Sequence, residues 1–300
     1  MKLCLKIAVI AATYLAATAT SSAQSLGPVL QKIKDSGGIT IGHRDVSVPF
    51  SYLDNDQKPI GFSLDLCATV VDKIKQAVGL KDLKISYQLV NSSNRIPLVK
   101  NGTVDIECGT TANTIARQRE VAFSVAYYWP QFMWIALKKS GVSTTDDLKG
   151  KAVVVTQGTV TSQFVAQLNQ EKALGLNIIQ AKDNGEAFLL VTNGRAAAFM
   201  EDDILLVGLR SRTPDPNVYV LLQDAYLSDP YGIMMSKDDP ELKKLVDGVI
   251  VEQMRSGQYA KLYKKWFESP IPPNQTNLEF PQSDRVKQLV AHPSDRAKGQ

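Results

Sequence analysis

Residues 151–170 read KAVVVTQGTVTSQFVAQLNQ, and this stretch combines a strand, a turn and a helix. Its first part, residues 151–156, carries three consecutive valines, and β-branched residues of this kind favour a buried strand. Gly158 then interrupts the pattern as a turn residue does. Residues 161–170 are predicted to form a helix. A strand that leads directly into a helix indicates an α/β fold.

The same alternation of strands and helices occurs twice along the chain, with no repeat of the sequence itself. In the first half, strands are predicted at 39–42, 84–90 and 104–108, with helices at 65–78 and 95–100. In the second half, strands are predicted at 151–156, 177–181 and 196–200, with helices at 161–170 and 184–191. Two α/β lobes are therefore expected from a chain of this length.

Two further apolar runs, residues 132–138 and 231–236, are interpreted as the crossings of a hinge between the lobes. The predicted division places residues 24–134 and 235–269 in lobe 1, residues 135–234 in lobe 2 and residues 270–300 in a C-terminal extension. Helices are expected at 241–256 and 259–266, before a proline-rich break.

The first residues have the pattern of a signal peptide. Lys2 and Lys6 precede the apolar run 7–17, and small residues follow at 21–23. This order predicts a leader over residues 1–23 that is removed on export. The run is too short for a transmembrane anchor, which needs about 20 apolar residues. Cys4 precedes the run, so no lipid anchor is expected and the mature protein is predicted to be periplasmic.

Composition narrows the functional classes. The 44% of hydrophobic and 21% of charged residues are typical of a globular protein. A formal charge of +4 is too small to indicate a nucleic-acid partner. Only two histidines are present, so no metal site and no cofactor are predicted.

An oxidising compartment allows Cys67 and Cys108 to form a bridge, but two separate buried thiols are the favoured prediction.

Residues 105–111 read DIECGTT, and Arg117 follows them shortly afterwards. An apolar strand thus ends in hydroxyl residues and then supplies a fixed cation. Arginine offers a planar set of donors that matches a carboxylate, and hydroxyls and free amides complete the hydrogen bonds of such an anion. The alternative is a surface arginine after a loop. No nucleophile with a neighbouring base is evident, so binding is predicted.

Several longer stretches match one known family in the same order. They are GHR at 42–44, VPFSY at 48–52, NRIPL at 94–98, ECG at 107–109, LKGKAVVVT at 148–156, GRA at 194–196 and WF at 266–267. On these stretches the chain resembles the family 3 amino-acid-binding proteins of ATP-binding-cassette (ABC) importers. The resemblance implies a type II periplasmic-binding-protein fold, in which two lobes close over one amino acid. It also implies a monomer that delivers this ligand to the membrane subunits of a permease.

The resemblance also assigns the groups that hold the backbone of the ligand. Arg117 and Thr110 are implied for its α-carboxylate. Asp202 is implied for its α-ammonium, because a buried ammonium needs a carboxylate counter-ion. The alternative is that the acidic residues at this point merely cap the next helix, which is the role expected of Asp203.

For the ligand side chain, the resemblance points to Arg44, Ser92 and Arg95. Two arginines in one small site are unfavourable without an anion between them, so an acidic ligand, glutamate or aspartate, is predicted. Phe50 is predicted to pack against the methylene groups of the ligand, or else to be an ordinary core aromatic.

Three positions differ from what the glutamate- and aspartate-binding members of the family carry. Ala112 and Val160 replace hydroxyl residues, although the neighbouring Thr159 keeps one. Asn184 replaces a histidine that helps to hold the side-chain carboxylate in those members. These differences predict weaker binding, or a shift toward a related acidic amino acid.

Two other functions remain as alternatives. One is the same fold with another polar amino acid as its ligand. The other is a periplasmic enzyme such as a dehydratase of cyclic acids, which needs a general acid or base in the cleft. Glu107 and His43 are the candidates for that role, besides Asp202. The enzyme is the less favoured of the two.

Overall fold

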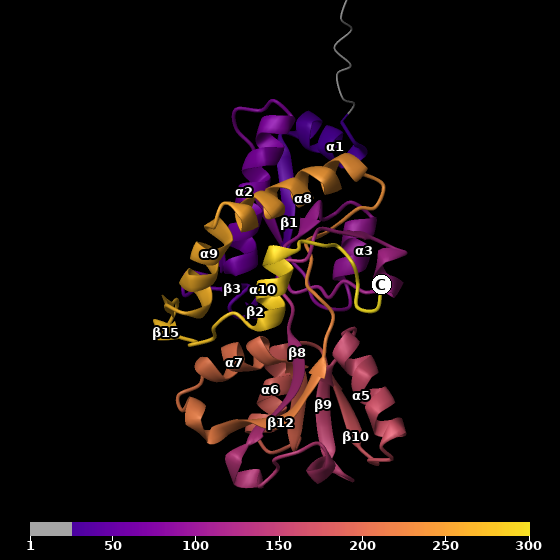
Figure 1. Cartoon of the computed structure of the whole chain (residues 1–300), viewed down its shortest axis with the longest axis vertical. Helices are drawn as coiled ribbons and strands as arrows, with labels where there is room; N and C mark the ends of the chain where they lie inside the picture. Colours follow the sequence, from indigo (N-terminus) through magenta and orange to yellow (C-terminus); the bar gives the residue numbers. More distant parts are fainter. Residues whose placement is uncertain (1–25) are drawn as a thin grey trace, which may run out of the picture.

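The computed structural model describes residues 26–300, and its strands form two five-stranded sheets in separate lobes (Figure 1). The first sheet has the order β5 (Lys84–Leu89), β1 (Gly38–His43), β6 (Ile106–Glu107), β13 (Met234–Met235) and β7 (Ala122–Phe123). The second has the order β10 (Asn177–Ala181), β9 (Ala152–Thr156), β11 (Ala198–Asp202), β8 (Gln131–Leu137) and β12 (Tyr219–Leu227). The α/β fold with two lobes is thus confirmed. The predicted signal peptide lies outside the described residues.

Helices cover both sheets, and each sheet mixes parallel with antiparallel neighbours. The first lobe contains α1 (Pro28–Ser36), α2 (Phe62–Ala77), α3 (Arg95–Lys100), α4 (Ile115–Gln118), α8 (Pro240–Arg255) and α9 (Gln258–Phe267). It also contains the small sheet of β2 (Val46–Ser47), β3 (Ser51–Leu53) and β4 (Pro59–Ile60). The second lobe contains α5 (Val160–Glu171), α6 (Asn184–Thr192) and α7 (Asp203–Ser211). Within residues 26–300, no helix has the length and apolar character needed to cross a membrane.

Two of the helices that border the cleft between the lobes, α5 and α6, begin where the side chain of the preceding residue accepts a backbone hydrogen bond. The hydroxyl of Thr159 accepts from the N–H of Ser162 at the start of α5. The carboxylate of Asp183 accepts from the N–H of Glu186 at the start of α6. Such N-caps satisfy donors that the first helical turn leaves free. The positions of both helix starts are therefore determined locally.

The crossings between the lobes differ from the prediction. Residues 132–138 were expected to form one of them, but β8 pairs with β11 and β12 inside the second sheet. Its apolar sequence reflects burial within that sheet. The chain instead passes between the sheets at residues 124–130 and 228–233, where Tyr128 and Tyr231 form an antiparallel bridge. Both crossings appear as thin segments between the two lobes in Figure 1.

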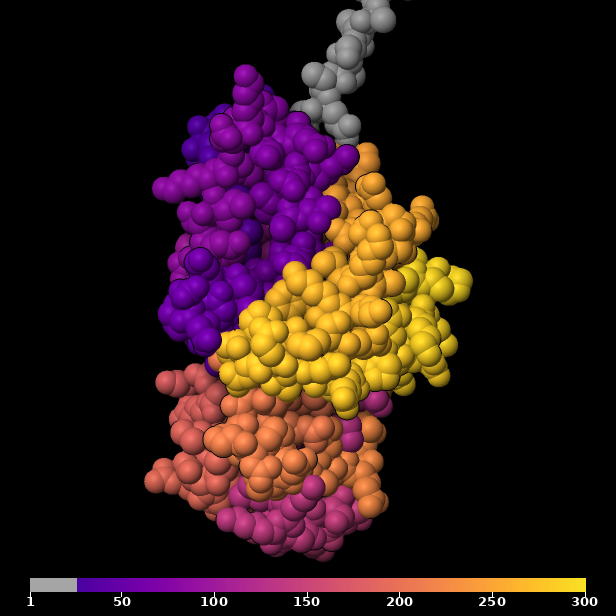
Figure 2. All heavy atoms as spheres, turned by 90° about the vertical axis from the view of Figure 1, so that its left-hand side faces the viewer, coloured from indigo at the N-terminus to yellow at the C-terminus, as the bar shows by residue number. Residues whose placement is uncertain are grey.

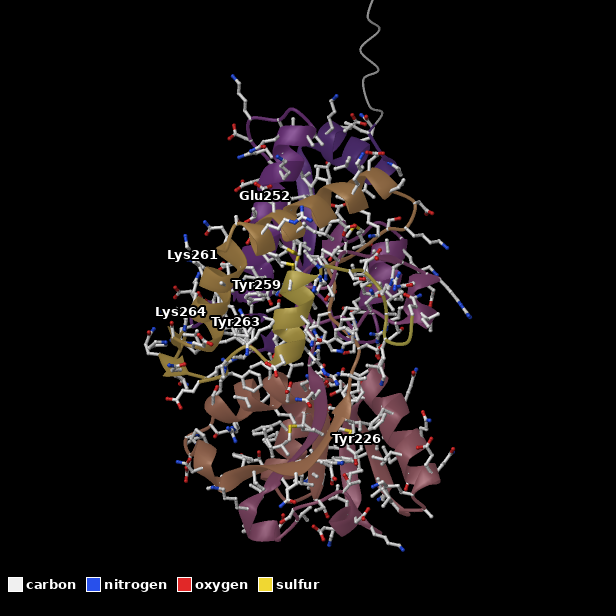
Figure 3. The ribbon with its side chains drawn as sticks, viewed as in Figure 1. Tyr226, Glu252, Tyr259, Lys261, Tyr263 and Lys264 are labelled. Atoms are coloured by element: carbon white, nitrogen blue, oxygen red, sulfur yellow. A yellow bond between two sulfur atoms is a disulfide. The ribbon has the colours of Figure 1, made fainter. Side chains whose placement is uncertain are left out.

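An aromatic cluster anchors these crossings in the first lobe. Tyr127 and Tyr231 are fully buried and pack beside Phe50. Tyr259 and Tyr263, which are labelled on α9 in Figure 3, pack against Phe62 in the same core. Aromatic pairs in edge-to-face geometry add to the stabilisation that burial provides. The crossings are therefore held firmly at their first-lobe end.

The two cysteines form a disulfide, so the prediction of separate thiols is wrong. Cys67 lies in α2 and Cys108 follows β6, and their Cα atoms are 6.4 Å apart. The two cysteines are 41 residues apart in the sequence, so their closeness in space could not be recognised from it. Because α2 packs across the sheet, the end of β6 comes beside the second turn of the helix. Local sequence patterns contain no information on that contact.

The C-terminal extension contains β14 (Pro270–Ile271), β15 (Thr276–Asn277) and α10 (Asp284–Ala291). Figure 2 shows the last residues spread over one side of the first lobe, down to the junction with the second. The carbonyl of Ser294 accepts from the N–H of Ala126 in the first crossing. The ammonium of Lys298 donates to the carbonyl of Leu227 at the end of β12. The extension therefore braces both crossings.

Candidate functional site

The carboxyl ends of parallel strands from both sheets face one small cavity between the lobes. This is the place where open α/β sheets bind ligands. Its lining residues are Arg44, Ser92, Arg95, Thr110, Ala112, Arg117, Thr159, Val160, Thr161, Asn184, Glu201, Asp202 and Leu205. The cavity has a volume of about 20 Å³, which is room for about one water molecule. An amino acid can enter only if the lobes move apart.

All the predicted site residues line this cavity except Phe50. The Phe50 side chain is fully buried, with its ring centroid 4.9 Å from that of Tyr128 and 5.5 Å from that of Phe267. It belongs to the aromatic cluster behind the cavity. Of the two interpretations given from the sequence, the core aromatic is the one that matches the structure, and contact with a ligand is not supported.

Arg117 joins the two lobes. Its Nη1 donates to the carbonyl of Ala112 at 2.9 Å, and its Nη2 donates to the carbonyl of Gly158 in the second lobe at 3.1 Å. The helix that carries it is capped by Thr114, whose hydroxyl accepts from the N–H of Arg117. The guanidinium is thus positioned by backbone groups and keeps its full charge for an anion.

Arg44 and Arg95 are buried cations that form no ion pair with any carboxylate of residues 26–300. Their exposed fractions are 2% and 3%, and the Nε of each has no hydrogen-bond partner within the described chain. Among residues 26–300, no carboxylate lies within 4.0 Å of either guanidinium. Burial, together with the charge of Arg117, lowers the pKa of Arg95 to about 9. Buried charges are normally paired, so these two favour an anionic ligand.

Two adjacent carboxylates at the end of β11 face the arginines. Asp202 accepts from the hydroxyls of Ser228 and Tyr231. Glu201 accepts from the hydroxyl of Thr161 at 3.3 Å and from the N–H of Asp202 at 3.1 Å. Burial raises the pKa of both carboxyl groups, and the charge of Glu201 raises that of Asp202 further. An ammonium group placed beside Asp202 would favour its ionised form, so this carboxylate can pair with a buried ammonium.

The sequence did not single out Glu201, Thr161 or Leu205 as site residues. Three consecutive acids after a predicted strand were a visible signal for Glu201, but only one of them was assigned to the ligand. Asp203 was expected to cap the next helix, but it is the first residue of α7, and Asp202 holds the N-cap position without a capping hydrogen bond. The carboxylate of Asp203 accepts from the N–H groups of Ile204 and Gln131. Thr161 could have been found from its place in the first turn of a helix that begins at the cleft.

The second lobe supplies polar groups that are already oriented. The Oδ1 of Asn184 accepts from the hydroxyl of Thr156 at 2.7 Å, which fixes the plane of the amide. The Thr159 hydroxyl donates to the carbonyl of Thr156 at 2.6 Å and also caps α5. Val160 begins this helix, and a helix N-terminus favours negative charge.

Glu107 and His43, the candidates for general acid–base catalysis, do not line the cavity. Glu107 is fully buried and accepts from the hydroxyl of Thr111 at 2.6 Å. The Nδ1 of His43 lies 3.0 Å from the carbonyl of Arg44.

Within residues 26–300, no three acidic, histidine or cysteine residues are grouped closely enough to hold a metal ion.

The lobes approach each other closely at two glycines of the second lobe. Gly158 has a φ of +73°, and a Cβ there would lie 2.9 Å from the hydroxyl of Ser93. Gly208 lies in α7, and a Cβ there would overlap the carbonyl of Val48 in the first lobe. Small residues at both points allow the cleft to close.

Comparison with known proteins agrees with this geometry. The pattern of the bacterial extracellular solute-binding proteins, family 3, matches residues 39–269. The chain belongs to this family. It is 46% identical to the L-glutamate/L-aspartate-binding protein of Pseudomonas aeruginosa over 279 residues, which cover 93% of this chain and 92% of the relative. It is 41% identical to the glutamate/aspartate import solute-binding protein of Escherichia coli, over 94% and 93% of the two chains.

The fold of this family 3 solute-binding protein is also found in solved structures. An ancestral arginine-binding protein bound to arginine superposes with a TM-score of 0.69 at 25% identity. The match covers 77% of this chain and 98% of the other. The relatives are binding proteins, not enzymes, which confirms the prediction of a non-enzymatic solute-binding protein of type II fold.

Proposed function

We propose that this protein captures an acidic amino acid, L-glutamate or L-aspartate, in the periplasm and delivers it to the membrane subunits of an ABC permease. The observation that carries the proposal is the pair of buried arginines, Arg44 and Arg95, which lack a carboxylate partner in the described chain. The names of the two relatives support the same ligand class. Arg117 would hold the α-carboxylate, and Asp202 the α-ammonium.

Capture would occur by closure of the two lobes about the crossings at residues 124–130 and 228–233, with a single chain as the working unit. The ligand first binds the first lobe through Arg44, Arg95, Thr110 and Arg117. The second lobe then closes with Asn184 and the acids of β11. Closure of this kind is a population shift driven by contacts of the ligand with both lobes. The small volume of the closed cavity supports this order of events.

Calorimetry of the mature protein with a panel of amino acids tests the proposal. Glutamate or aspartate is expected to bind tightly, and basic amino acids are expected not to bind. Tight binding of glutamine or arginine, without any response to acidic amino acids, would contradict the proposed ligand class. Another polar amino acid remains the second candidate, because the carboxylate of Glu201 reduces the positive charge of the site and the neutral Asn184 adds none.

Asn184→His is expected to tighten the binding of acidic amino acids by about fivefold, since one further hydrogen bond to a carboxylate contributes about 1 kcal/mol. The gain should be largest at low pH, where the imidazole is charged. Calorimetry with glutamate and glutamine measures it, and the affinity for glutamine is expected to change little. Unchanged or weaker binding of glutamate would place residue 184 outside the ligand contacts.

Gly208→Ala is expected to weaken ligand binding by about tenfold, because the added Cβ overlaps the carbonyl of Val48 and opposes closure. Gly248→Ala is the matched control. Gly248 also lies within a helix, α8, but its Cβ would meet no atom within 4 Å. Both changes raise helix propensity equally. Small-angle scattering with saturating ligand should show incomplete closure for Gly208→Ala alone, and equal affinities of the two variants would contradict the close approach.

A further inference from the structure

Glu201 places a second carboxylate in the cavity, beside the one assigned to the ligand ammonium. Its exposed fraction is 4%, and it lines the cavity together with Arg44 and Arg95. Its hydrogen bonds come from Thr161 and from the backbone of Asp202. Among residues 26–300, no arginine or lysine nitrogen lies within 4.0 Å of it. An ionised Glu201 is thus not neutralised by direct contact.

The charges around the cavity show why this matters for an acidic ligand. If Arg117 pairs with the α-carboxylate and Asp202 with the α-ammonium, then Arg44, Arg95 and Glu201 remain for the ligand side chain. A second carboxylate there is attracted by two guanidinium groups and repelled by the ionised Glu201. Repulsion between close charges is strong where water is excluded. A neutral amide side chain experiences no such repulsion.

The groups that face Glu201 come from every element around it. Arg44 follows β1, Arg95 lies on α3 and Arg117 on α4, and all three attract its charge. Asp202 adjoins it on β11, and Tyr231 reaches the same region from the second crossing. The phenol of Tyr231 donates to Asp202 and cannot neutralise Glu201. The repulsion is therefore relieved most directly by a proton on Glu201 itself.

We propose that Glu201 takes up a proton from solvent when an acidic amino acid binds, and that it thereby sets how well the cleft distinguishes acids from amides. This inference rests on the proposed function. Protonated Glu201 has one O–H donor, which can hydrogen-bond to the side-chain carboxylate of the ligand. Burial raises the pKa of the Glu201 carboxyl, so the protonated form is accessible.

The sign of the pH dependence follows from this uptake. The acidic ligand raises the pKa of Glu201 above its value in the free protein, so the complex binds more protons than the free protein. The affinity for glutamate should therefore rise as the pH falls, until Glu201 is protonated in both states. The affinity for an amide ligand should not change through this group.

Calorimetry of the full mature chain in buffers of different ionisation enthalpy counts the protons. Across a series of pH values above the ordinary titration range of a carboxyl, glutamate is expected to bind with the uptake of up to about one proton more than glutamine. Glutamine, where it binds, is the matched ligand. Its α-ammonium would release the same proton from Asp202 as the α-ammonium of glutamate, so the difference between the two ligands reports the protonation of Glu201. Glu201→Gln should abolish the uptake and bind glutamate about tenfold more tightly at about pH 8.

Glu107→Gln is the control, since Glu107 is a buried carboxylate that does not line the cavity. It should keep the proton uptake of the wild type. Equal proton uptake with glutamate and glutamine, or an excess uptake with glutamate that survives Glu201→Gln and disappears in Glu107→Gln, would overturn the role of Glu201. Failure of every acidic amino acid to bind would overturn the proposed function instead, so the two failures are distinguishable.

Discussion

Arg95→Met is expected to weaken the binding of glutamate or aspartate by about a hundredfold or more, and yet to raise the melting temperature of the ligand-free protein. The loss of binding follows because truncating one partner of a buried charge pair costs about 2–5 kcal/mol. Arg95 is one of the two cations that face the side chain of the ligand, and it has no counter-ion in the described chain. No other change proposed for this protein is expected to reduce binding as much.

The gain in stability has an electrostatic origin. The pKa of Arg95 is lowered to about 9, mainly by burial and then by the charge of Arg117. A base with a lowered pKa is charged at neutral pH at a cost to the folded state. Removing this charge should raise the melting temperature by about 2 °C or more. The folded protein thus keeps a destabilising group that its ligand requires.

Calorimetry and thermal unfolding measure the two effects on the same samples. Arg255→Met serves as the control, because Arg255 is exposed near the end of α8 and should leave affinity and melting temperature unchanged. An Arg95→Met variant that binds glutamate like the wild type would show that this side chain does not contact the ligand. A lower melting temperature would show that Arg95 is stabilised by contacts other than those described.

Replacing both Cys67 and Cys108 by alanine is expected to lower the free energy of unfolding by about 4 kcal/mol, because the disulfide closes a long loop in the unfolded chain. Urea titration with and without a reducing agent measures this loss. The reducing agent should destabilise the wild type by a similar amount and leave the double variant unchanged.

The disulfide also bears on the site. Cys108 directly precedes Gly109 and Thr110, and Thr110 lines the cavity. Ligand added at saturation should restore part of the lost stability, since it binds only the folded state. A double variant as stable as the wild type, with no response of either protein to the reducing agent, would contradict the bridge.

Much of the secondary structure could be predicted because its signals are local. The helix α3 matches its predicted bounds of 95–100, and β10 matches 177–181. Asn101 and Gly102, directly after α3, are typical of a helix end, and Gly102 adopts a φ of +74° there. The strand before Cys108 was predicted too long, because only Ile106 and Glu107 find a partner strand.

The cleft residues were predicted by two routes. Arg117 and the hydroxyls after the strand at 104–108 were visible in the sequence itself, and the resemblance to the family implied the others. The carboxyl ends of parallel strands meet at one edge of a sheet, which brings these residues together. Ten of the predicted side chains line the cavity, although their contacts with a ligand remain a prediction. For Phe50 the sequence left ligand contact and core packing as alternatives, because an aromatic beside a motif gives no sign of which neighbours it packs against.

The sequence by itself determined the alternation of strands and helices, the two lobes and the paired arginines that favour an acidic ligand. The alternation and the lobes follow from periodicity and turn residues, which act over a few neighbouring positions. The arginine pair was implied by the resemblance to the family, and side-chain chemistry then favours an acidic ligand. Only the tertiary structure decided the true crossings, the Cys67–Cys108 bridge and the presence of Glu201 in the cavity. Those features depend on which distant segments pack together, and packing is set by the burial of the whole chain.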